Sequence, residues 1–450
     1  MPFIPHTEAE IEAMLGVIGA ASIDDLFDEI PGHLQVDGLH KVPEGISEMA
    51  MLAKLEARAR QDDAGVCFVG AGSYDHHIPA AVWDITARGE FMTAYTPYQA
   101  EASQGTLQLI YEYQSMLAKL TGMDVSNASV YDGASGLAEA MLMAVRANRK
   151  APAKKVLVPE TVHPLYRRAA TNIVSNQGIE VCTLPMSADG RLDHAALADW
   201  VDDCAALVVQ QPNFFGALED VDALAGWAQS NNVLLIAVAN PLSLAMLKPP
   251  GEWGADIVCG DGQPFGIPMA SGGPSFGFMC TNSKYVRQMP GRIIGRTVDL
   301  DGKPGYALTL QAREQHIRRA KATSNICTNQ GLLVTAGTIY LSLLGELGLQ
   351  GVAQQCHHNA LQLKRALCAL PGVDLAFAGA FFNEFVIRLP RSAESVVDEL
   401  LMQGIHAGLP LGDYFPDMQN ALLVCATEKR TPAEIDNYAR ALGALLGDAA

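Results

Sequence analysis

Apolar runs and amphipathic segments alternate along the middle of the chain. The apolar runs are short and rich in β-branched residues, and they predict strands at 156–158, 179–184, 206–210, 233–239 and 256–258. The segments between them carry apolar residues at helical spacing and predict helices at 136–149, 165–177, 194–204 and 221–231. Strands that are apolar throughout and separated by helices are typical of a mostly parallel sheet covered on both faces. The pattern therefore predicts an α/β fold.

The N-terminal segment has a helical pattern. Thr7 and Glu10 have the spacing of a capping box, and apolar residues follow them at helical spacing. Helices are expected over 7–18, 22–31 and 47–60. We interpret residues 1–64 as an N-terminal helical arm that precedes a large domain over 65–330.

The C-terminal segment mixes both patterns. Long helices are predicted at 330–346 and 351–370, strands at 373–377, 385–389 and 421–426, and further helices at 395–403 and 432–446. We therefore expect a smaller α+β domain over 331–450, which includes the long linking helix.

Composition narrows the class of protein. A chain of 450 residues is longer than one hydrophobic core usually organises, which favours a large domain with a smaller one. The hydrophobic content of 49% and the charged fraction of 18% fit a well-packed, enzyme-like body. The net charge of -18 argues against nucleic acid or an anionic membrane as a partner, since both require clustered Lys and Arg. Small molecules and proteins are the expected partners.

Several features bear on metals and on the compartment. The nine cysteines form no C-x-x-C pair, and the adjacent His76 and His77 diverge without a spaced third ligand, so no metal site is predicted. The N-terminus has no basic flank before an apolar run. The most apolar window, 233–247, is interrupted by a proline and is too short to span a bilayer. We expect a cytoplasmic protein without a membrane segment.

Two positions are candidates for holding an anionic aromatic ligand. Gly133 and Ser135 lie in a turn that opens onto an alanine-rich helix, where small residues and helix N-terminal amides favour a phosphate. A plain helix N-terminus with glycine for packing explains this turn equally well. His163 follows a predicted strand and could stack on a ring, although a lone histidine is more often structural.

The end of the predicted sheet resembles the setting in which pyridoxal phosphate (PLP) enzymes hold their Schiff-base lysine. A strand runs into a Gly-rich turn at 255–266, yet no lysine occurs between Lys248 and Lys284. Asn240 stands where such a scaffold places an acid, and an amide cannot hold the pyridinium protonated as a carboxylate would. Covalent PLP chemistry by this chain alone is therefore not expected. The alternative is that this was never a PLP pocket.

Two further segments are rich in polar residues. Residues 91–105 combine Tyr, Thr, Pro and amides in a loop-like stretch of the kind that carries binding groups, or else form a buried connector. Residues 309–330 end in a Thr/Ser/Asn cluster before a long helix, which suits an anion contact or a subunit interface. An exposed helix followed by an N-cap would explain the charges of this second segment.

Together these stretches resemble the alpha subunits of two-subunit bacterial glycine decarboxylases, the P-proteins of the glycine cleavage system. The similarity runs nearly from end to end, and it is carried by Ile11–Leu15, Leu26–Pro31, Gly72–Tyr74, Tyr95–Glu101, Gly262–Pro264 and Lys321–Asn329. The resemblance implies a fold-type I PLP-transferase architecture. It also implies that the PLP lysine belongs to the beta subunit, so the missing lysine agrees with it.

The resemblance implies an activity shared with that beta subunit in an α2β2 assembly. The assembly would decarboxylate glycine, release carbon dioxide and transfer the aminomethyl group to the lipoyl group of the H-protein. This chain would supply an interface and a wall of the partner's pocket, with no catalytic residue of its own.

Three groups of site residues follow from the same resemblance. The expected partner-site wall or substrate contacts are Tyr95, Thr96, Tyr98, Gln99, Ser103 and Gln104. The expected contacts with cofactor phosphate or the interface are Thr323, Ser324, Asn325, Thr328 and Asn329. The expected vestigial PLP pocket comprises Gly133, Ser135, His163, Asn240 and Gln263.

Two other functions stay open from the sequence. One is a self-sufficient PLP lyase or transferase that uses Lys248, Lys284 or Lys303. The other is a structural or regulatory pseudoenzyme.

Overall fold

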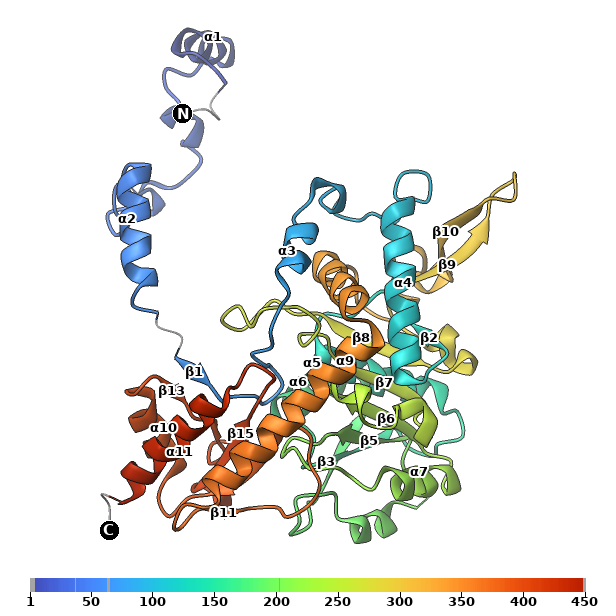
Figure 1. Ribbon diagram of the computed structural model, residues 1–450. Helices are drawn as coiled ribbons and strands as arrows, with labels where there is room; N and C mark the ends of the chain where they lie inside the picture. The colour runs from blue at the N-terminus through green and yellow to red at the C-terminus, as the bar shows by residue number, and fades with distance from the viewer. Residues whose placement is uncertain (1–4, 37, 63–64, 202, 448–450) are drawn as a thin grey trace. The chain divides into compact units, whose positions relative to one another are not determined.

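The computed structural model describes residues 5–36, 38–62, 65–201 and 203–447. The chain divides into two compact units, 1–63 and 64–450. The first unit holds two helices, α1 (Glu8–Ile18) and α2 (Glu48–Ala59), drawn in blue in Figure 1. The predicted capping box is present, since the Thr7 hydroxyl accepts from the Glu10 amide and the Glu10 carboxylate accepts from the Thr7 amide.

The helix predicted over 22–31 is wrong. That segment forms only a 3-10 turn at Asp24–Phe27. The Asp25 carboxylate accepts hydrogen bonds from the amides of Ala21 and Ser22, which fixes the chain in a turn.

A seven-stranded sheet with the order β2-β8-β7-β6-β5-β3-β4 organises the second unit (Figure 1). The strands are β2 (Val125–Ser126), β3 (Lys155–Pro159), β4 (Glu180–Leu184), β5 (Ala206–Gln211), β6 (Leu234–Ala239), β7 (Ile257–Asp261) and β8 (Gly277–Thr281). Strands β4, β3, β5, β6 and β7 are parallel, whereas β8 and β2 are antiparallel to their neighbours. The predicted mostly parallel sheet is confirmed.

Alternate residues of the central strands face opposite helical layers. In β6, Leu234, Ile236 and Val238 pack into a core with α5 (Gly133–Ala147) and α6 (Pro164–Val174). The residues between them, Leu235 and Ala237, pack into a second core with α4 (Gln104–Thr121), α7 (Val221–Ser230) and residues of α9 (Gly331–Leu367). This alternation covers both faces of the sheet.

The long helix α9 (Gly331–Leu367, orange in Figure 1) links the large sheet to the C-terminal layer. Gly345 has φ 61° and ψ -169°, so two helical halves meet there, close to the break predicted between 346 and 351. Among the described residues this helix is long and apolar enough to cross a membrane by length and composition alone. Val334 and Tyr340 pack in the sheet core and Leu363 in the C-terminal core, which accounts for its apolar character.

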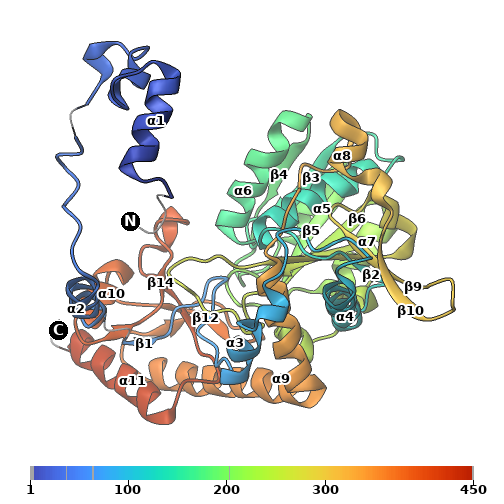
Figure 2. The same cartoon turned by 90° about the horizontal axis from the view of Figure 1, so that it is seen from above.

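The C-terminal layer is a four-stranded antiparallel sheet with helices (Figure 2). Its strands, in spatial order, are β11 (Asp374–Leu375), β12 (Glu384–Arg388), β15 (Ala421–Cys425) and β14 (Leu409–Pro410), and its helices are α10 (Ala393–Leu401) and α11 (Pro432–Gly447). Strand β1 (Val66–Cys67) pairs with β13 (Ile405–His406). The first residues of the second unit therefore join the C-terminal layer and not the large sheet.

Several elements were not predicted. They include the strands β2, β8, β13 and β14 and the helices α3 (Ala80–Thr86), α4 and α8 (Gln315–Arg318). They also include the hairpin of β9 (Ile293–Val298) and β10 (Pro304–Thr309), which projects from the body in both views. The segment predicted as a helix over 194–204 is a 3-10 helix, His194–Trp200. Leu107, Ile110, Tyr113 and Leu117 of α4 are buried at helical spacing, so a longer window would have found that helix.

Candidate functional site

A small cavity lies at the carboxyl ends of β3, β5, β6 and β7, where open α/β sheets bind ligands. It has a volume of about 40 Å³ and is lined by His163, Asn240 and Asp261 from the large sheet and by Glu384 from β12. Four residues predicted for a vestigial pocket thus lie on or near it. His163 and Asn240 are in its lining, and Gly133 and Gln263 contact the lining residues Tyr166 and Tyr74.

Glu384 is the central charge of the cavity. Its carboxylate accepts from the Ala71 amide at 2.6 Å and from the Tyr74 hydroxyl at 2.8 Å. Burial raises the pKa of Glu384 to about 7, against the lowering effect of these two hydrogen bonds. The cavity therefore holds an acid that is largely protonated below neutral pH.

Carboxylates of the protein itself accept hydrogen bonds from the backbone amides at the N-terminus of α5. The Asp132 carboxylate accepts from the Ser135 amide at 2.7 Å, and the Asp261 carboxylate accepts from the Gly133 amide at 3.2 Å. Burial raises the pKa of Asp261, and its hydrogen bonds to Ser275, Gln263 and Gly133 oppose that effect. Because the protein's own carboxylates use these amides, they do not present an open phosphate cradle.

Tyr166 occupies the space next to this helix end. A side chain added at Gly133 would meet the Tyr166 hydroxyl oxygen at 2.2 Å. The His163 ring stacks on Tyr166 at 4.8 Å with an interplanar angle of 25°, so it does stack on a ring, but on one from the chain itself. Burial lowers the pKa of His163, and its Nε2 lies 2.8 Å from the Ala71 carbonyl oxygen.

The side chains of Asn240 and Gln263 form hydrogen bonds with backbone groups. The Asn240 side-chain oxygen accepts from the Leu242 amide at 3.1 Å. The Gln263 side chain accepts from the Tyr74 amide and donates to the carbonyl oxygens of Tyr74 and Ile267, each at 2.8 or 2.9 Å. Gln263 therefore fixes the segment that carries Tyr74, and through it the position of Glu384.

No lysine lines the cavity among the described residues. The three lysines considered for a self-sufficient enzyme each form an ion pair elsewhere: Lys248 with Asp222 at 3.1 Å, Lys284 with Asp256 at 3.1 Å, and Lys303 with Asp301 at 3.8 Å. A cavity of this volume is also far below the roughly 300 Å³ of typical ligand sites. The residues present do not fit PLP in this chain's own cavity.

A second cluster joins the two polar segments. The Tyr98 hydroxyl donates to the Asn329 side-chain oxygen at 2.9 Å, and the Asn329 amide group donates to the Ser129 hydroxyl. The Arg292 guanidinium lies 4.3 Å from the Tyr98 ring centre, and it donates to the Cys327 carbonyl oxygen. The structure thus brings together Tyr98 and Asn329, which are 231 residues apart in the sequence.

The other predicted residues of the polar segment 91–105 differ in their exposure and in their hydrogen bonds. Tyr95 is 86% exposed, and Thr96 and Gln99 are exposed as well. Ser103 precedes α4 without a side-chain cap. The Gln104 side chain bonds to both the amide and the carbonyl of Tyr306, which ties α4 to the β9–β10 hairpin.

Residues 323–328, which precede Asn329 of this cluster, form hydrogen bonds with neighbouring segments. The Ser324 hydroxyl donates to Glu139 of α5 at 2.6 Å, and burial raises the pKa of Glu139. Asn325 accepts from Gln315 at 3.3 Å, and the Thr323 amide donates to the Arg313 carbonyl oxygen. Thr328 lines a hollow of about 10 Å³ beside Tyr98.

Sequence reasoning missed Glu384, Tyr166 and Arg292. Glu384 begins the strand predicted over 385–389, and a carboxylate at the head of an apolar run was a usable signal. Arg292 and Tyr166 lie in stretches whose spacing resembles ordinary surface helix or strand, so no local signal marked them.

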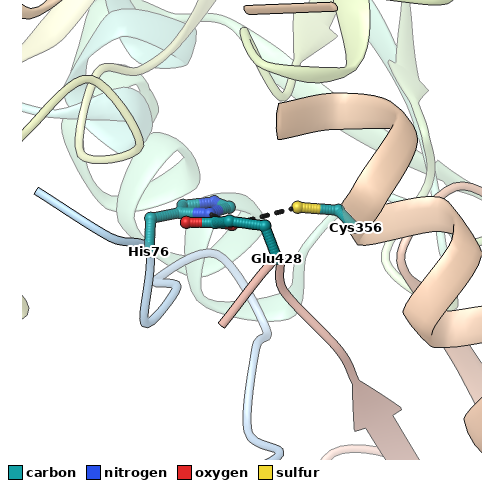
Figure 3. Close-up of side chains that lie close together, drawn as sticks. All are labelled: His76, Cys356 and Glu428. Carbon is teal, nitrogen blue, oxygen red and sulfur yellow. Dashed lines mark hydrogen bonds and ion pairs between the residues drawn. The ribbon is translucent and has the colours of Figure 1, made fainter. Parts of the chain in front are cut away.

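His76, Cys356 and Glu428 converge from a loop, from α9 and from the segment after β15 (Figure 3). Glu428 accepts from His76 at 2.7 Å and from the Cys356 thiol at 3.2 Å. Burial alone would raise the pKa of Glu428, but the hydrogen bond and charge of His76 lower it to about 2. These mutual hydrogen bonds explain the cluster as a buried tie between three segments.

The chain matches the family model of the glycine cleavage system P-protein over residues 1–442. It is 58% identical over 451 residues to the probable glycine dehydrogenase (decarboxylating) subunit 1 of Legionella pneumophila (strain Lens), covering 99% of both chains. It is also 58% identical over 451 residues to the protein of the same description from Thioalkalivibrio sulfidiphilus (strain HL-EbGR7), covering 99% of this chain and 100% of the relative.

Solved structures agree with these relatives. A glycine decarboxylase (P-protein) of the glycine cleavage system in inhibitor-bound form superposes with a TM-score of 0.89 at 44% identity, covering 99% of this chain and 100% of that one. Lactobacillus brevis glutamate decarboxylase superposes with a TM-score of 0.67 at 14% identity, covering 93% and 97%, and shows that the fold-type I PLP-transferase architecture is shared. The chain therefore belongs to the P-protein family of the glycine cleavage system.

Proposed function

We propose that this chain is the subunit of a two-subunit glycine decarboxylase that does not carry the PLP-binding lysine. Its partner, subunit 2, would carry PLP on a lysine, and the assembly would decarboxylate glycine and pass the aminomethyl group to the lipoyl group of the H-protein. The observation that carries this proposal is the small cavity, lined by Glu384 and Asp261 and by no lysine among the described residues, inside a P-protein fold. PLP bound in the partner would supply the electron sink for loss of carbon dioxide.

In this proposal the chain contributes the Tyr98–Asn329 cluster to the partner's pocket. Tyr98 and Asn329 hold one another, and Arg292 braces both segments, so the loops are preorganised before glycine binds. The exposed Tyr95 and Thr96 lie in the same loop and are available to contact the partner's substrate. These groups would orient glycine and exclude water from the reacting centre.

Reconstitution with subunit 2 tests the proposal. The chain alone should give no glycine–bicarbonate exchange and no pyridoxyl-lysine after treatment with PLP and borohydride. Adding subunit 2 and lipoylated H-protein should produce exchange, with the pyridoxyl label on subunit 2 only. Stoichiometric labelling of one lysine in this chain, such as Lys284, would favour the self-sufficient enzyme. Assembly without any gain in exchange would favour a structural or regulatory role.

A further inference from the structure

The N-terminal unit presents apolar helix faces, and its described residues, 5–36 and 38–62, include no buried residue. Neither α1 nor α2 contains a buried residue. On α2, Met51, Leu52 and Leu55 share one face and are 37%, 49% and 51% exposed. On α1, Met14 and Ile18 lie one turn apart and are likewise exposed. Large apolar side chains at helical spacing with nothing of their own unit to cover them indicate a surface that packs against other protein.

The same unit is strongly acidic. Residues 1–63 contain 13 Asp and Glu against four Lys and Arg, which gives a formal charge of -9, half of the -18 carried by the whole chain. The remainder of the chain carries the other half. Like charges repel, so neither the chain's own body nor a second copy of it is the best electrostatic match for this unit. A different chain that offers an apolar groove with a basic rim fits both properties.

One stretch of the second unit carries a net positive charge. Residues 284–321 contain nine Lys and Arg against three Asp and Glu, and this stretch includes Arg292 of the Tyr98–Asn329 cluster. A second copy could therefore compete for the acidic unit through this stretch. Binding of a second copy depends on the concentration of the chain, which distinguishes it from binding of subunit 2.

We propose that residues 1–63 form a docking arm that grips subunit 2, with the apolar faces of α1 and α2 laid in a basic-rimmed groove on that subunit. The inference rests on the proposed function, because it takes its partner from there. The arm supplies binding free energy and takes no part in the chemical step. Affinity for subunit 2 and turnover of the assembled enzyme are thus separable properties.

Limited trypsin digestion of the full chain tests where the arm docks. The arm offers four cleavage sites, after Lys41, Lys54, Arg58 and Arg60. These sites should be cut in the isolated chain and at least about tenfold more slowly in the complex with subunit 2. Unchanged cleavage in an active complex overturns the inference. Protection in the isolated chain also overturns it, in favour of the chain's own body if protection is independent of concentration, and of a second copy if protection rises with concentration.

Paired substitutions supply the second measurement. The double variant Leu52→Gln/Leu55→Gln should weaken the Kd for subunit 2 by at least about tenfold, since two buried leucines are lost from the interface. Its turnover at saturating subunit 2 should equal that of the wild type. Met402→Gln is the matched control, since Met402 is 87% exposed on the body. A double variant that binds like Met402→Gln overturns the arm inference alone, whereas a wild-type chain that ignores subunit 2 overturns the proposed function with it.

Discussion

The cavity around Glu384 and the cluster around Tyr98 use polar groups in opposite ways. In the cavity, buried carboxyl groups satisfy backbone amides and the Tyr74 hydroxyl, and the remaining volume is about 40 Å³. In the cluster, Tyr98 and Asn329 hold each other near the surface, next to exposed residues such as Tyr95. The carboxyl ends of the parallel strands are thus occupied by buried side chains that stabilise the interior. The candidate for contacts with a partner lies in loops instead.

The largest effect should come from removing the central carboxyl group of the cavity. Glu384→Ala leaves the Ala71 amide and the Tyr74 hydroxyl buried without partners and should lower the free energy of unfolding by about 4 kcal/mol. Urea denaturation measures this loss. Glu384→Gln, which keeps the shape and one acceptor, is the control. Equal stability of the alanine variant and the wild type would show that the cavity is not a stabilising element.

The stability of the protein should depend on pH because of the buried carboxyl group of Glu384 in the cavity. The pKa of Glu384 is raised to about 7 in the folded chain, so the unfolded chain releases this proton first as the pH rises. The stability contribution of the protonated acid is fully present below the unfolded pKa of about 4.5 and should fall by on the order of 3 kcal/mol by pH 7. The free energy of unfolding of the wild type minus that of Glu384→Gln, measured between pH 5 and pH 7.5, isolates this effect. A difference that stays flat over this range contradicts the assignment.

A smaller effect on activity is expected from the cluster. Tyr98→Phe removes the hydrogen bond to Asn329 and should lower turnover of the assembled enzyme about tenfold, which corresponds to about 1.4 kcal/mol at the transition state. Stability and assembly should change little, because Tyr98 lies near the surface. Tyr285→Phe, in the 3-10 helix Ser283–Gln288 that follows β8, is the control in the same glycine–bicarbonate exchange assay. Full activity of both Tyr98→Phe and Thr328→Val would show that the cluster is only structural.

The smallest effect should come from the lysines outside both regions. Lys284→Met breaks an ion pair with Asp256, yet it should change unfolding by less than about 1 kcal/mol, because the Lys284 side chain is 60% exposed. Exchange activity should stay within about twofold of the wild type. Loss of activity in this variant, or in the same change at Lys248 or Lys303, would favour the alternative of a self-sufficient PLP enzyme that uses the substituted lysine.

The sequence predicted the parallel sheet well because its strands are apolar throughout and regularly spaced. It placed the strand at 206–210 within one residue of β5, and it located the break in the long helix near Gly345. The interior of the cavity was harder to foresee. Glu384 reaches it from a strand more than 100 residues beyond the large sheet, and contacts of that separation leave no periodic signal in the sequence.

The polar segments show the same limit. Their composition identified both 91–105 and 309–330, and the structure brings them together through Tyr98 and Asn329. Their anchors, Arg292 and Glu139, come from a strand end and from a helix interior. Which members of a polar loop face outward depends on those anchors, so spacing alone could not separate Tyr95 from Tyr98.

The carboxylates that cap α5 also bear on whether this chain could acquire a PLP site through mutation. A lysine introduced after β7 would lie next to the Asp261 carboxylate at a cavity of about 40 Å³, with Tyr166 still against Gly133 and the Gly133 amide still bonded to Asp261. Such a site would require changes at Asp261, Tyr166 and Glu384 together with the new lysine. In the proposed two-subunit enzyme, a single substitution in this chain would therefore not restore a PLP site.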